Sequence, residues 1–567
     1  MTTIQAASTT VPASDGVNLA VHAYTEIDNR RPTILAVHGY PDNHHVWDGV
    51  ARELSRRHDG KYNFVAFDVR GAGESSTPAE RSGYRLPQLV ADIGAVIDSL
   101  GVDAVHLLAH DWGSIQAWAA VTDDSVMGRV ASFTSISGPH LNYAGKFLRS
   151  ARTPRAVADV VKQFFASSYI WFILSPVVPE LAARSGVGAK IFETVEHIGQ
   201  TSTRTQRRAD YRSTRDYLNG LNLYRANMPA PMLKPPARLP QTTVPVQVLA
   251  ARQDYFVSPA LQRFTGSIPA RSRVLPIEGG HWVVASRPDV IARLTAEWID
   301  LVIEGGATVA ESVVATGRRD VRGKLALVTG SGAGIGRATA MELARQGAAT
   351  VLVVDRDLAG AEGTADAVRS AGAEAAVYQV DVSDETAMNT LAAQVLDKHG
   401  VVDILVNNAG MGLAGRFFET TPEQWDAIMD VNVRGVIHAS RAFGAQMVER
   451  GQGGAIINLS SAAAYVPFKS AVAYVTTKAA VLAFSESLRA DLADEGITVT
   501  AVCPGFVNTN FAKSMIYPGM TAKAIVKAVR TGPAVLPVTP KSWVGYAARR
   551  ISPSSIRRFA RLDIRQR

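Results

Sequence analysis

Short apolar runs alternate with amphipathic stretches along most of the chain, in two successive series. The runs of the first series are TILAVHG (33–39), NFVAFD (63–68), AVHLLAH (104–110) and VPVQVLA (244–250). Those of the second are KLALVTG (324–330), TVLVVD (350–355), AAVYQVD (375–381), VDILVNNAG (402–410), GAIINLSS (454–461) and ITVTAVCPG (497–505). Buried strands that alternate with helices form parallel sheets with helices on both faces. The pattern therefore predicts two α/β domains.

The alternation is interrupted in two places. Residues 140–240 lose it and are rich in Tyr, Phe and Trp, which predicts a helical lid over the ends of the first sheet's strands. Residues 304–322 are small and polar, as expected of a linker. We therefore predict a first domain at 1–303, a second at 323–540 and a tail at 541–567.

Size and composition agree with a soluble two-domain protein. The 567 residues exceed one ordinary core, and the hydrophobic and charged fractions, 47% and 19%, are normal for globular chains. Cys503 is the lone cysteine, so no intrachain disulfide can form, which favours a reducing, cytoplasmic setting. The N-terminus lacks a signal-peptide pattern, and Pro176 and Pro179 break the apolar run at 163–179, so we expect no transmembrane helix.

The net charge of +8 is concentrated in the tail, which holds eight Lys or Arg residues and one acidic residue, Asp563. This uneven distribution argues against a nucleic-acid-binding surface. On a helix, four arginines of the tail would share one arc: Arg557, Arg558, Arg561 and Arg565. Two interpretations stay open: a solvated helix packed on its own domain, and a helix lying on an anionic membrane surface at the inner membrane face.

Candidate chemistry begins at the stretch Ala109-His110-Asp111-Trp112-Gly113, which follows a buried run. Small residues around a central nucleophile allow a strand to turn sharply into a helix and expose that side chain. A serine attacking a saturated carbon would form a stable ether, whereas a carboxylate forms an ester that water can cleave. Asp111 therefore indicates a substrate opened at an sp³ carbon, either an epoxide or an alkyl halide.

This stretch resembles the nucleophile elbow of the α/β-hydrolase fold, with Asp in place of Ser. In that fold an acid and a histidine follow the nucleophile in chain order, and Asp254 and His281 match them. His281 would activate water, and Asp254 would orient its ring. HGYPD (38–42) resembles the family's HGxP loop with a cis Pro41, which implies an oxyanion hole formed by the backbone N–H groups of Tyr40 and Trp112.

Two lid tyrosines distinguish the possible substrates. Tyr169 and Tyr224 match the proton-donating pair of the α/β-hydrolase epoxide hydrolases. The resemblance implies that their hydroxyls stabilise the opening epoxide oxygen. Dehalogenases of haloacetate carry arginines shortly after the nucleophile, and WGSIQAW (112–118) has none. An epoxide is favoured, and a haloalkane or haloacid dehalogenase is the alternative.

The second series begins with a glycine-rich loop, Gly330 to Gly336, directly after a buried run. Its glycines allow a tight turn and bring a pyrophosphate to a helix N-terminus. Asp355 ends the next run, where a carboxylate would bind ribose hydroxyls and select NAD over NADP. Arg356 could accept a 2′-phosphate, so NADP stays open.

Residues 324–510 resemble the short-chain dehydrogenase/reductase family. Tyr474 and Lys478 fit its Tyr-x-x-x-Lys signature, Ser461 stands at the family spacing, and Asn432 matches the fourth catalytic residue. The resemblance implies that Tyr474 is the general acid or base and that Lys478 lowers its pKa. The cofactor-binding residues implied are Gly330, Ser331, Gly334, Ile335, Gly336, Asp355, Arg356, Asp381, Val382, Asn408, Ala409, Gly410, Tyr474, Lys478, Pro504, Gly505, Val507 and Thr509.

The whole chain is similar to mycobacterial two-domain proteins that join an epoxide hydrolase to a short-chain dehydrogenase. The expected fold class is α/β: an N-terminal α/β-hydrolase fold with a helical lid and a C-terminal Rossmann fold. The resemblance implies a bifunctional enzyme that turns an apolar, lipid-like epoxide into a diol and interconverts an alcohol and a carbonyl with NAD. One active half with a regulatory or binding partner half is the alternative. We expect no metal, no nucleic acid and a homo-oligomer formed through the dehydrogenase domain.

Overall fold

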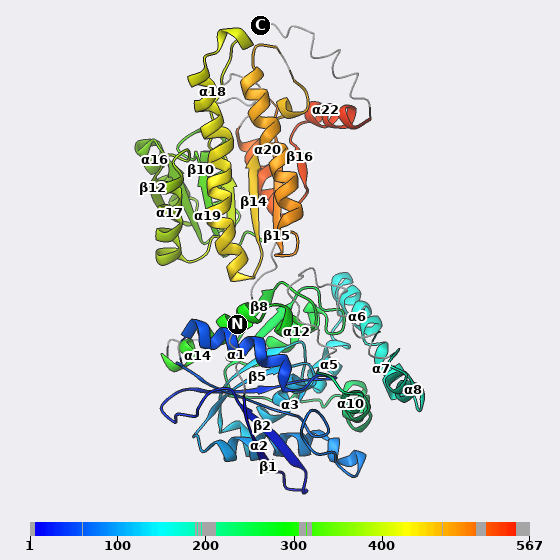
Figure 1. Cartoon of the computed structure of the whole chain (residues 1–567). Coiled ribbons are helices and arrows are strands. Elements are labelled where there is room, and N and C mark those ends of the chain that lie inside the picture. The colour runs from blue at the N-terminus through cyan, green and yellow to red at the C-terminus, as the bar shows by residue number, and fades with distance from the viewer. Residues whose placement is uncertain are drawn as a thin grey trace. The chain divides into compact units, whose positions relative to one another are not determined.

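The computed structural model of the chain describes residues 6–58, 60–187, 190, 194, 211–305, 313–314, 320–467, 469–505 and 518–551. It divides into two compact units, Met1–Ala315 and Thr316–Arg567. Each unit is built around its own sheet (Figure 1). Val507, Thr509 and the four tail arginines at 557, 558, 561 and 565 lie outside the described residues.

Within the described part of the first unit, nine strands form one sheet in the order β1-β2-β4-β3-β5-β6-β7-β8-β9. The strands are β1 Ala7–Pro12, β2 Asn18–Ala23, β3 Thr33–Val37, β4 Asn63–Phe67, β5 Val105–His110, β6 Val130–Ile136, β7 Val246–Ala251, β8 Ser272–Ile277 and β9 Val313–Val314. β2 runs antiparallel to both of its neighbours, and every other pair is parallel. Because β3, β5, β7 and β8 are parallel, the loops after them meet at one edge of the sheet.

Both faces of this sheet are apolar, since alternate side chains of a strand point to opposite faces. In β3, Leu35 and Val37 belong to one buried cluster, and Ile34 and Ala36 belong to the other. Helices cover both faces (Figure 1). They are η1 His44–Trp47, α1 Asp48–His58, η2 Arg81–Tyr84, α2 Leu86–Leu100, α3 Trp112–Ala120, α4 Asp124–Met127, α12 Pro259–Gly266, α13 Val283–Ser286 and α14 Pro288–Ile303.

The described residues between β6 and β7 are largely helical, as the loss of strand alternation over residues 140–240 predicts. Its described elements are α5 Leu141–Phe147, α6 Pro154–Ala166, α7 Tyr169–Leu174, α8 Val178–Arg184, α10 Thr214–Asn227 and α11 Ala230–Leu233. One described stretch, Pro154–Leu174, is long and apolar enough to cross a membrane, by length and composition only. The run at 163–179 is too short and too interrupted by proline to span a membrane. The stretch Pro154–Leu174, which contains α6 and α7, is long enough, so the expectation of no transmembrane helix does not follow from length here.

The described part of the second unit contains a seven-stranded, fully parallel sheet in the order β12-β11-β10-β13-β14-β15-β16. Its strands are β10 Leu325–Thr329, β11 Thr350–Asp355, β12 Glu374–Gln379, β13 Ile404–Asn407, β14 Gly454–Leu459, β15 Ile497–Cys503 and β16 Val535–Pro537. The strand order reverses between β10 and β13, which is where an open α/β sheet binds its ligand.

Two apolar layers cover this sheet as well. Ala326 and Val328 of β10 join one buried cluster, and Leu325 and Leu327 join the other. The helical elements are α15 Gly334–Arg345, α16 Leu358–Ser370, α17 Glu385–His399, η4 Phe417–Glu419, α18 Pro422–Met429, η5 Asp430–Arg434, α19 Gly435–Arg450, η6 Ala462–Ala464, α20 Val472–Asp491, α21 Pro518–Thr531 and α22 Pro540–Ile551.

Candidate active sites

Asp111 lies in a strained turn between β5 and α3. Its φ of 52° falls in the left-handed region, which a residue with a side chain rarely adopts. Gly113 is required two residues later, because a Cβ there would collide with the carbonyl oxygens of Val37 and His38. The tight approach of α3 to β3 turns the buried Asp111 carboxylate toward the loop after β3.

That loop supplies a hydrogen-bond donor to the nucleophile. The backbone N–H of Tyr40 donates to Asp111 Oδ1 over 2.7 Å, and the Tyr40–Pro41 peptide is cis, as the HGYPD motif implies. Trp112 is the first residue of α3, so its backbone N–H lies at a helix N-terminus, which favours negative charge. The Tyr40 N–H thus holds one carboxylate oxygen of Asp111, and the N-terminus of α3 begins at the next residue.

His281 stands between the two carboxylates of the site. Its Nε2 lies 3.4 Å from Asp111 Oδ2, and its Nδ1 lies 3.1 Å from both oxygens of Asp254. Burial lowers the pKa of His281, but the charge of Asp254 and the hydrogen bond to Asp111 raise it to about 10. Burial also opposes the charge on Asp254, yet His281 and the N–H group of Val257 hold the pKa of that carboxyl below its usual value. His281 is therefore an imidazolium in the free enzyme.

Three residues of this site carry no sequence signal. Gln262 of α12 donates to Asp254 Oδ2 over 3.3 Å. The ring of Phe256 packs edge-on against His281, 4.9 Å between centroids, and against Tyr169, at 5.0 Å. The buried Gln163 of α6 donates to the carbonyl of Phe256 over 2.8 Å and so attaches the lid to the loop that carries Asp254. These residues become neighbours only through tertiary packing, and no motif spacing could identify them.

The two lid tyrosines reach the same site from different helices. Tyr169 begins α7 and Tyr224 lies in α10, with ring centroids 6.1 Å apart and the hydroxyl groups hydrogen-bonded to each other. The Tyr224 ring also packs against Trp112, 4.9 Å away. Burial raises the pKa of both phenols well above the ordinary value. Both hydroxyls therefore stay protonated and can donate.

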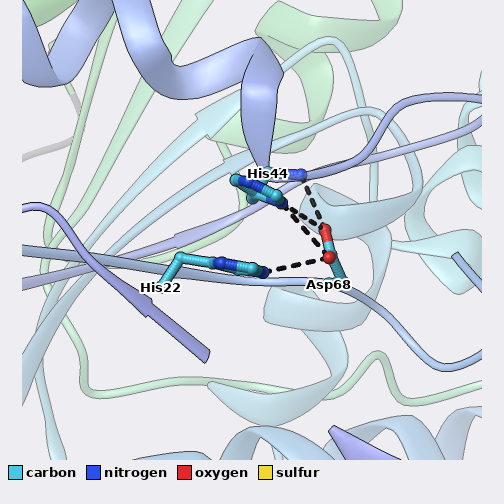
Figure 2. A group of neighbouring side chains, drawn as sticks. All are labelled: His22, His44 and Asp68. Carbon is cyan, nitrogen blue, oxygen red and sulfur yellow. Dashed lines mark hydrogen bonds and ion pairs between the residues drawn. The ribbon is translucent and has the colours of Figure 1, made fainter. Parts of the chain in front are cut away.

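A second cluster of titratable groups comes from β2, η1 and the residue after β4 (Figure 2). His22, His44 and Asp68 are buried, and their nitrogen and carboxylate ligand atoms lie within 4.8 Å of one another, close enough to hold a metal ion. Asp68, however, also accepts backbone N–H groups of His44 and Glu74, each over 2.8 Å, besides the rings of His22 and His44 at 3.0 Å. Burial raises the pKa of Asp68, but the two histidines lower it further, so this carboxylate is ionised and fully hydrogen-bonded. These hydrogen bonds explain why the three side chains lie together. We therefore interpret the cluster as a structural support for the loop at residues 38–42.

In the second unit, the glycine loop packs closely against itself and against the loop after β13. Cβ atoms on Gly330 and Gly336 would collide with the backbone of Ala409 and the carbonyl oxygen of Gly330. Asp355, at the end of β11, accepts the N–H of Gly332 over 2.7 Å. Gly334, Ile335 and Gly336 open α15, whereas the buried Ser331 hydroxyl is engaged by the backbone of Val328 and Val354. The Gly-rich cradle, the helix N-terminus and the carboxylate fit a nicotinamide dinucleotide.

The loop after β13 holds this cradle in place. The side chain of Asn408 donates to the carbonyl oxygens of Thr329 and Gly330 over 3.0 and 2.8 Å. The backbone N–H groups of Asn408 and Ala409 donate in turn to the Thr329 hydroxyl. Asp381 after β12 is exposed and Val382 is buried, while Arg356 is exposed beside Asp355.

Tyr474, Ser461 and Lys478 meet around α20, which begins at Val472. The hydroxyl of Tyr474 is hydrogen-bonded to Ser461, and Lys478 Nζ lies 5.9 Å from the Tyr474 ring centroid while donating to the carbonyl of Leu459 over 2.8 Å. The resemblance implies that Lys478 lowers the pKa of Tyr474. In the structure the pKa of Tyr474 is raised, because burial raises it more than the hydrogen bond to Ser461 lowers it. Burial also lowers the pKa of Lys478 to about 8, so this lysine is a weaker cation than the sequence suggests.

Asn432 lies in a π-helical turn, η5, a distortion that often marks functional sites. Its side chain accepts the N–H of Met411 over 2.8 Å and donates to the Met411 carbonyl and to the hydroxyl of Thr477. It thereby joins the loop after Gly410 to α20. Pro504 and Gly505 follow β15, with the Pro504 carbonyl accepting the N–H of Ala462 beside Ser461.

Comparison with known proteins places these two sites in one family. A family model described as alpha/beta hydrolase fold matches residues 32–288, and one described as short chain dehydrogenase matches residues 324–517. A protein of Mycobacterium tuberculosis named "Probable oxidoreductase EphD" is 36% identical over 607 residues, which cover 100% of both chains. The chain belongs to the EphD family.

Members of the EphD family thus combine a hydrolase-fold domain with a short-chain dehydrogenase domain, and this chain is an enzyme with hydrolase and oxidoreductase domains. Epoxide hydrolase 4 of Mus musculus is 26% identical over 288 residues, 48% of this chain and 74% of the mouse protein. A crystal structure of 3-ketoacyl-(acyl-carrier-protein) reductase from Brucella melitensis, complexed with NADH, shares 32% identity at a TM-score of 0.37 and covers 39% of this chain and 98% of its own. The short chain dehydrogenase match supports a nicotinamide cofactor for the second unit.

Proposed function

We propose that the first unit hydrolyses an apolar epoxide to a vicinal diol through an ester of Asp111. The observation that carries the proposal is the placement of two protonated phenols, the partly buried Tyr169 and the buried Tyr224, at the same site as the Asp111, His281 and Asp254 set. A haloalkane needs no proton donor for its leaving halide, whereas an opening epoxide does. The phenol pair therefore favours the epoxide over the halide.

In the first step, one carboxylate oxygen of Asp111 forms a bond to an epoxide carbon, and the carbon–oxygen bond of the ring breaks. Tyr169 or Tyr224 donates a proton to the released alkoxide, which becomes a hydroxyl group. The products are a hydroxyalkyl ester on Asp111 and a phenolate that is reprotonated from solvent. Asp111 can act at once because His281, as an imidazolium, stabilises its charge.

The second step depends on the charge that the first step removes. The Asp111 ester is neutral, so one of the two carboxylates that raise the His281 pKa is gone. The pKa of His281 falls, so a larger fraction of the rings is neutral, and a neutral ring can take a proton from the water that attacks the ester carbonyl. The backbone N–H groups of Tyr40 and Trp112 stabilise the oxyanion. When it collapses, the ester carbon–oxygen bond breaks and the diol oxygen takes the proton from His281. The new Asp111 carboxyl then gives its proton to His281, which restores the carboxylate.

For the second unit we propose an NAD(H)-linked alcohol–carbonyl interconversion. The cofactor would supply or accept a hydride. Gly330, Gly336 and Asp355 would hold it, with the Asp355 carboxylate on the adenosine ribose hydroxyls. Ser461 would hydrogen-bond the substrate oxygen, and Tyr474 would give or take its proton.

A single-turnover experiment in ¹⁸O-water tests the ester route. Enzyme in excess over a long-chain epoxy fatty acid is quenched, and ¹⁸O is located by mass spectrometry in the diol and in the peptide containing Asp111. The expected result is label in Asp111 and none in the diol, since the ester oxygen comes from the carboxylate. Label directly in the diol would contradict the ester, and bromoalkane turnover without epoxide turnover would favour the dehalogenase alternative.

A further inference from the structure

The lid carries an apolar surface on the side that faces solvent. On α6, Val157, Val161, Phe164 and Phe165 recur at helical spacing and share one face, while the buried Gln163 points to the enzyme. Phe164 and Phe165 are 61% and 69% exposed. This arrangement reverses the usual one, in which the apolar face of a helix packs on the core and the polar face meets water.

The next two helices of the lid, α7 and α8, which follow α6 in Figure 1, also expose apolar side chains. In α7, Ile170 and Ile173 are buried, while Trp171 and Phe172 are exposed, Trp171 by 60%. In α8, Leu181 is exposed. We define the lid face as the exposed side chains of Val161, Phe164, Phe165, Trp171, Phe172 and Leu181. Exposed apolar side chains gathered on neighbouring elements of a protein surface mark interaction sites.

The charged residues of the lid indicate the charge of the surface that the lid face would bind. Over residues 141–187, six residues are basic and two, Asp159 and Glu180, are acidic. Arg152, Arg155 and Lys162 are exposed, and Lys162 lies on the same helix as the phenylalanines. Glu180 is already paired with Arg225, at 2.5 Å. An apolar face bordered by cations matches an anionic lipid surface, where acyl chains take the aromatic side chains and headgroups take the cations.

We propose that the lid face docks on an anionic lipid bilayer. The segment does not cross the bilayer in this arrangement, because its inner side is built into the enzyme. Gln163 donates to the Phe256 carbonyl and accepts the N–H of Ser258, and Tyr169 packs on Phe256. Since Tyr169 faces the site of Asp111 while the adjacent Trp171 faces outward, docking places the catalytic tyrosine's helix at the lipid surface. The lipid would then supply apolar epoxide directly to the lid.

Vesicle flotation of the full chain tests the proposal. Vesicles of phosphatidylglycerol and phosphatidylcholine are compared with pure phosphatidylcholine, using wild type, a Phe164→Ser/Phe165→Ser variant, and Phe418→Ser as the matched control. Phe418 is 96% exposed but belongs to the second unit. We expect wild type and control to float with anionic vesicles, and the lid variant to bind about tenfold or more weakly. Brominated lipids should quench a fluorescence component that Trp171→Phe removes.

Other outcomes overturn the proposal. They are equal flotation of the lid variant and wild type, and flotation lost only when residues 552–567 are deleted. Retention after carbonate washing would mean that the segment spans the bilayer. A wild-type dimer that the lid variant converts to a monomer without lipid would make the lid face an interface between two copies. Hydrolysis of a short soluble epoxide should be unchanged in the lid variant. This assay tests the proposed hydrolysis and flotation tests lipid docking, so either proposal can fail without the other.

Discussion

At the scale of the residue, the chemistry of the first unit turns on the two carboxylates that flank His281. We expect Asp111→Asn to lower the His281 pKa from about 10 by about 1 to 2 pH units, because removing a neighbouring negative charge destabilises the imidazolium. At about pH 9.5 the ring should then be largely neutral in the variant and largely charged in wild type. Titration of ¹³C-labelled histidine rings by NMR, with His281→Gln for assignment, measures this.

The control for that titration is Asp48→Asn. Asp48 Oδ2 lies 3.0 Å from His45 Nδ1 and raises the pKa of His45. Removing this carboxylate should therefore lower the pKa of His45 and leave the pKa of His281 unchanged. An unchanged His281 pKa in Asp111→Asn would show that loss of the Asp111 charge does not produce a neutral His281. The second step would then need another proton acceptor.

Asp355 provides a second prediction at this scale. Its carboxylate would repel a 2′-phosphate, and Arg356 beside it is exposed and able to accept one. Asp355→Ser should therefore tighten NADPH binding relative to NADH by about tenfold. Fluorescence titration with both cofactors measures the ratio. Asp357→Ser, which removes an exposed carboxylate two residues on, should not change it, and a wild type that already prefers NADPH would refute the assignment.

The residues that the sequence could identify are those that a strand end or a motif places. Asp111, Asp254 and His281 each follow a parallel strand of one sheet, so topology alone brings them to the same edge. Gln262 and Phe256 reach the site through the packing of α12 and of the loop after β7, which leaves no periodic trace. The Tyr474 pKa was mispredicted for a related reason, because spacing shows that Lys478 is near but not how deeply both are buried.

At the scale of the element, α7 and α10 hold the two phenols over the site. We expect Tyr169→Phe and Tyr224→Phe each to slow ester formation by about 100-fold, since each removes a proton donor to the epoxide oxygen. Rapid-quench measurement of the Asp111 ester gives this rate. Tyr143→Phe is the control: that tyrosine is also buried, but its hydroxyl donates to the Pro240 carbonyl. Full-speed ester formation in Tyr169→Phe would remove this tyrosine from the mechanism.

The sequence pattern predicts which segments are helical better than it predicts which face of a helix is buried. The aromatic content and lost alternation of residues 140–240 predict helices, and the structure has them. The same pattern on α6, apolar at 157, 161, 164 and 165, would ordinarily assign that face to the core. The structure turns it outward because Gln163 hydrogen-bonds the loop that carries Asp254. Which of two faces packs inward depends on this long-range contact, which the local sequence does not encode.

At the scale of the whole molecule, two units with separate sheets carry two separate sets of candidate catalytic groups. Asp111→Asn should abolish diol formation while leaving NADH binding intact, and Tyr474→Phe should slow NAD-linked oxidation by about 100-fold or more while leaving diol formation intact. Each substitution removes a reacting group from one unit only. Loss of both activities in either variant would mean that the halves do not function independently.

These two variants also test whether the fusion joins consecutive reactions. The diol that we propose for the first unit is an alcohol, which is the class of substrate that the NAD-linked reaction proposed for the second unit would oxidise. Neither variant alone should convert epoxide to NADH at the wild-type rate. An equal mixture should restore NADH formation after a lag, because the diol must leave one chain and accumulate before another chain binds it. If the diol, supplied directly to wild type with NAD, is never oxidised, the two chemistries act on different substrates and the fusion serves another purpose.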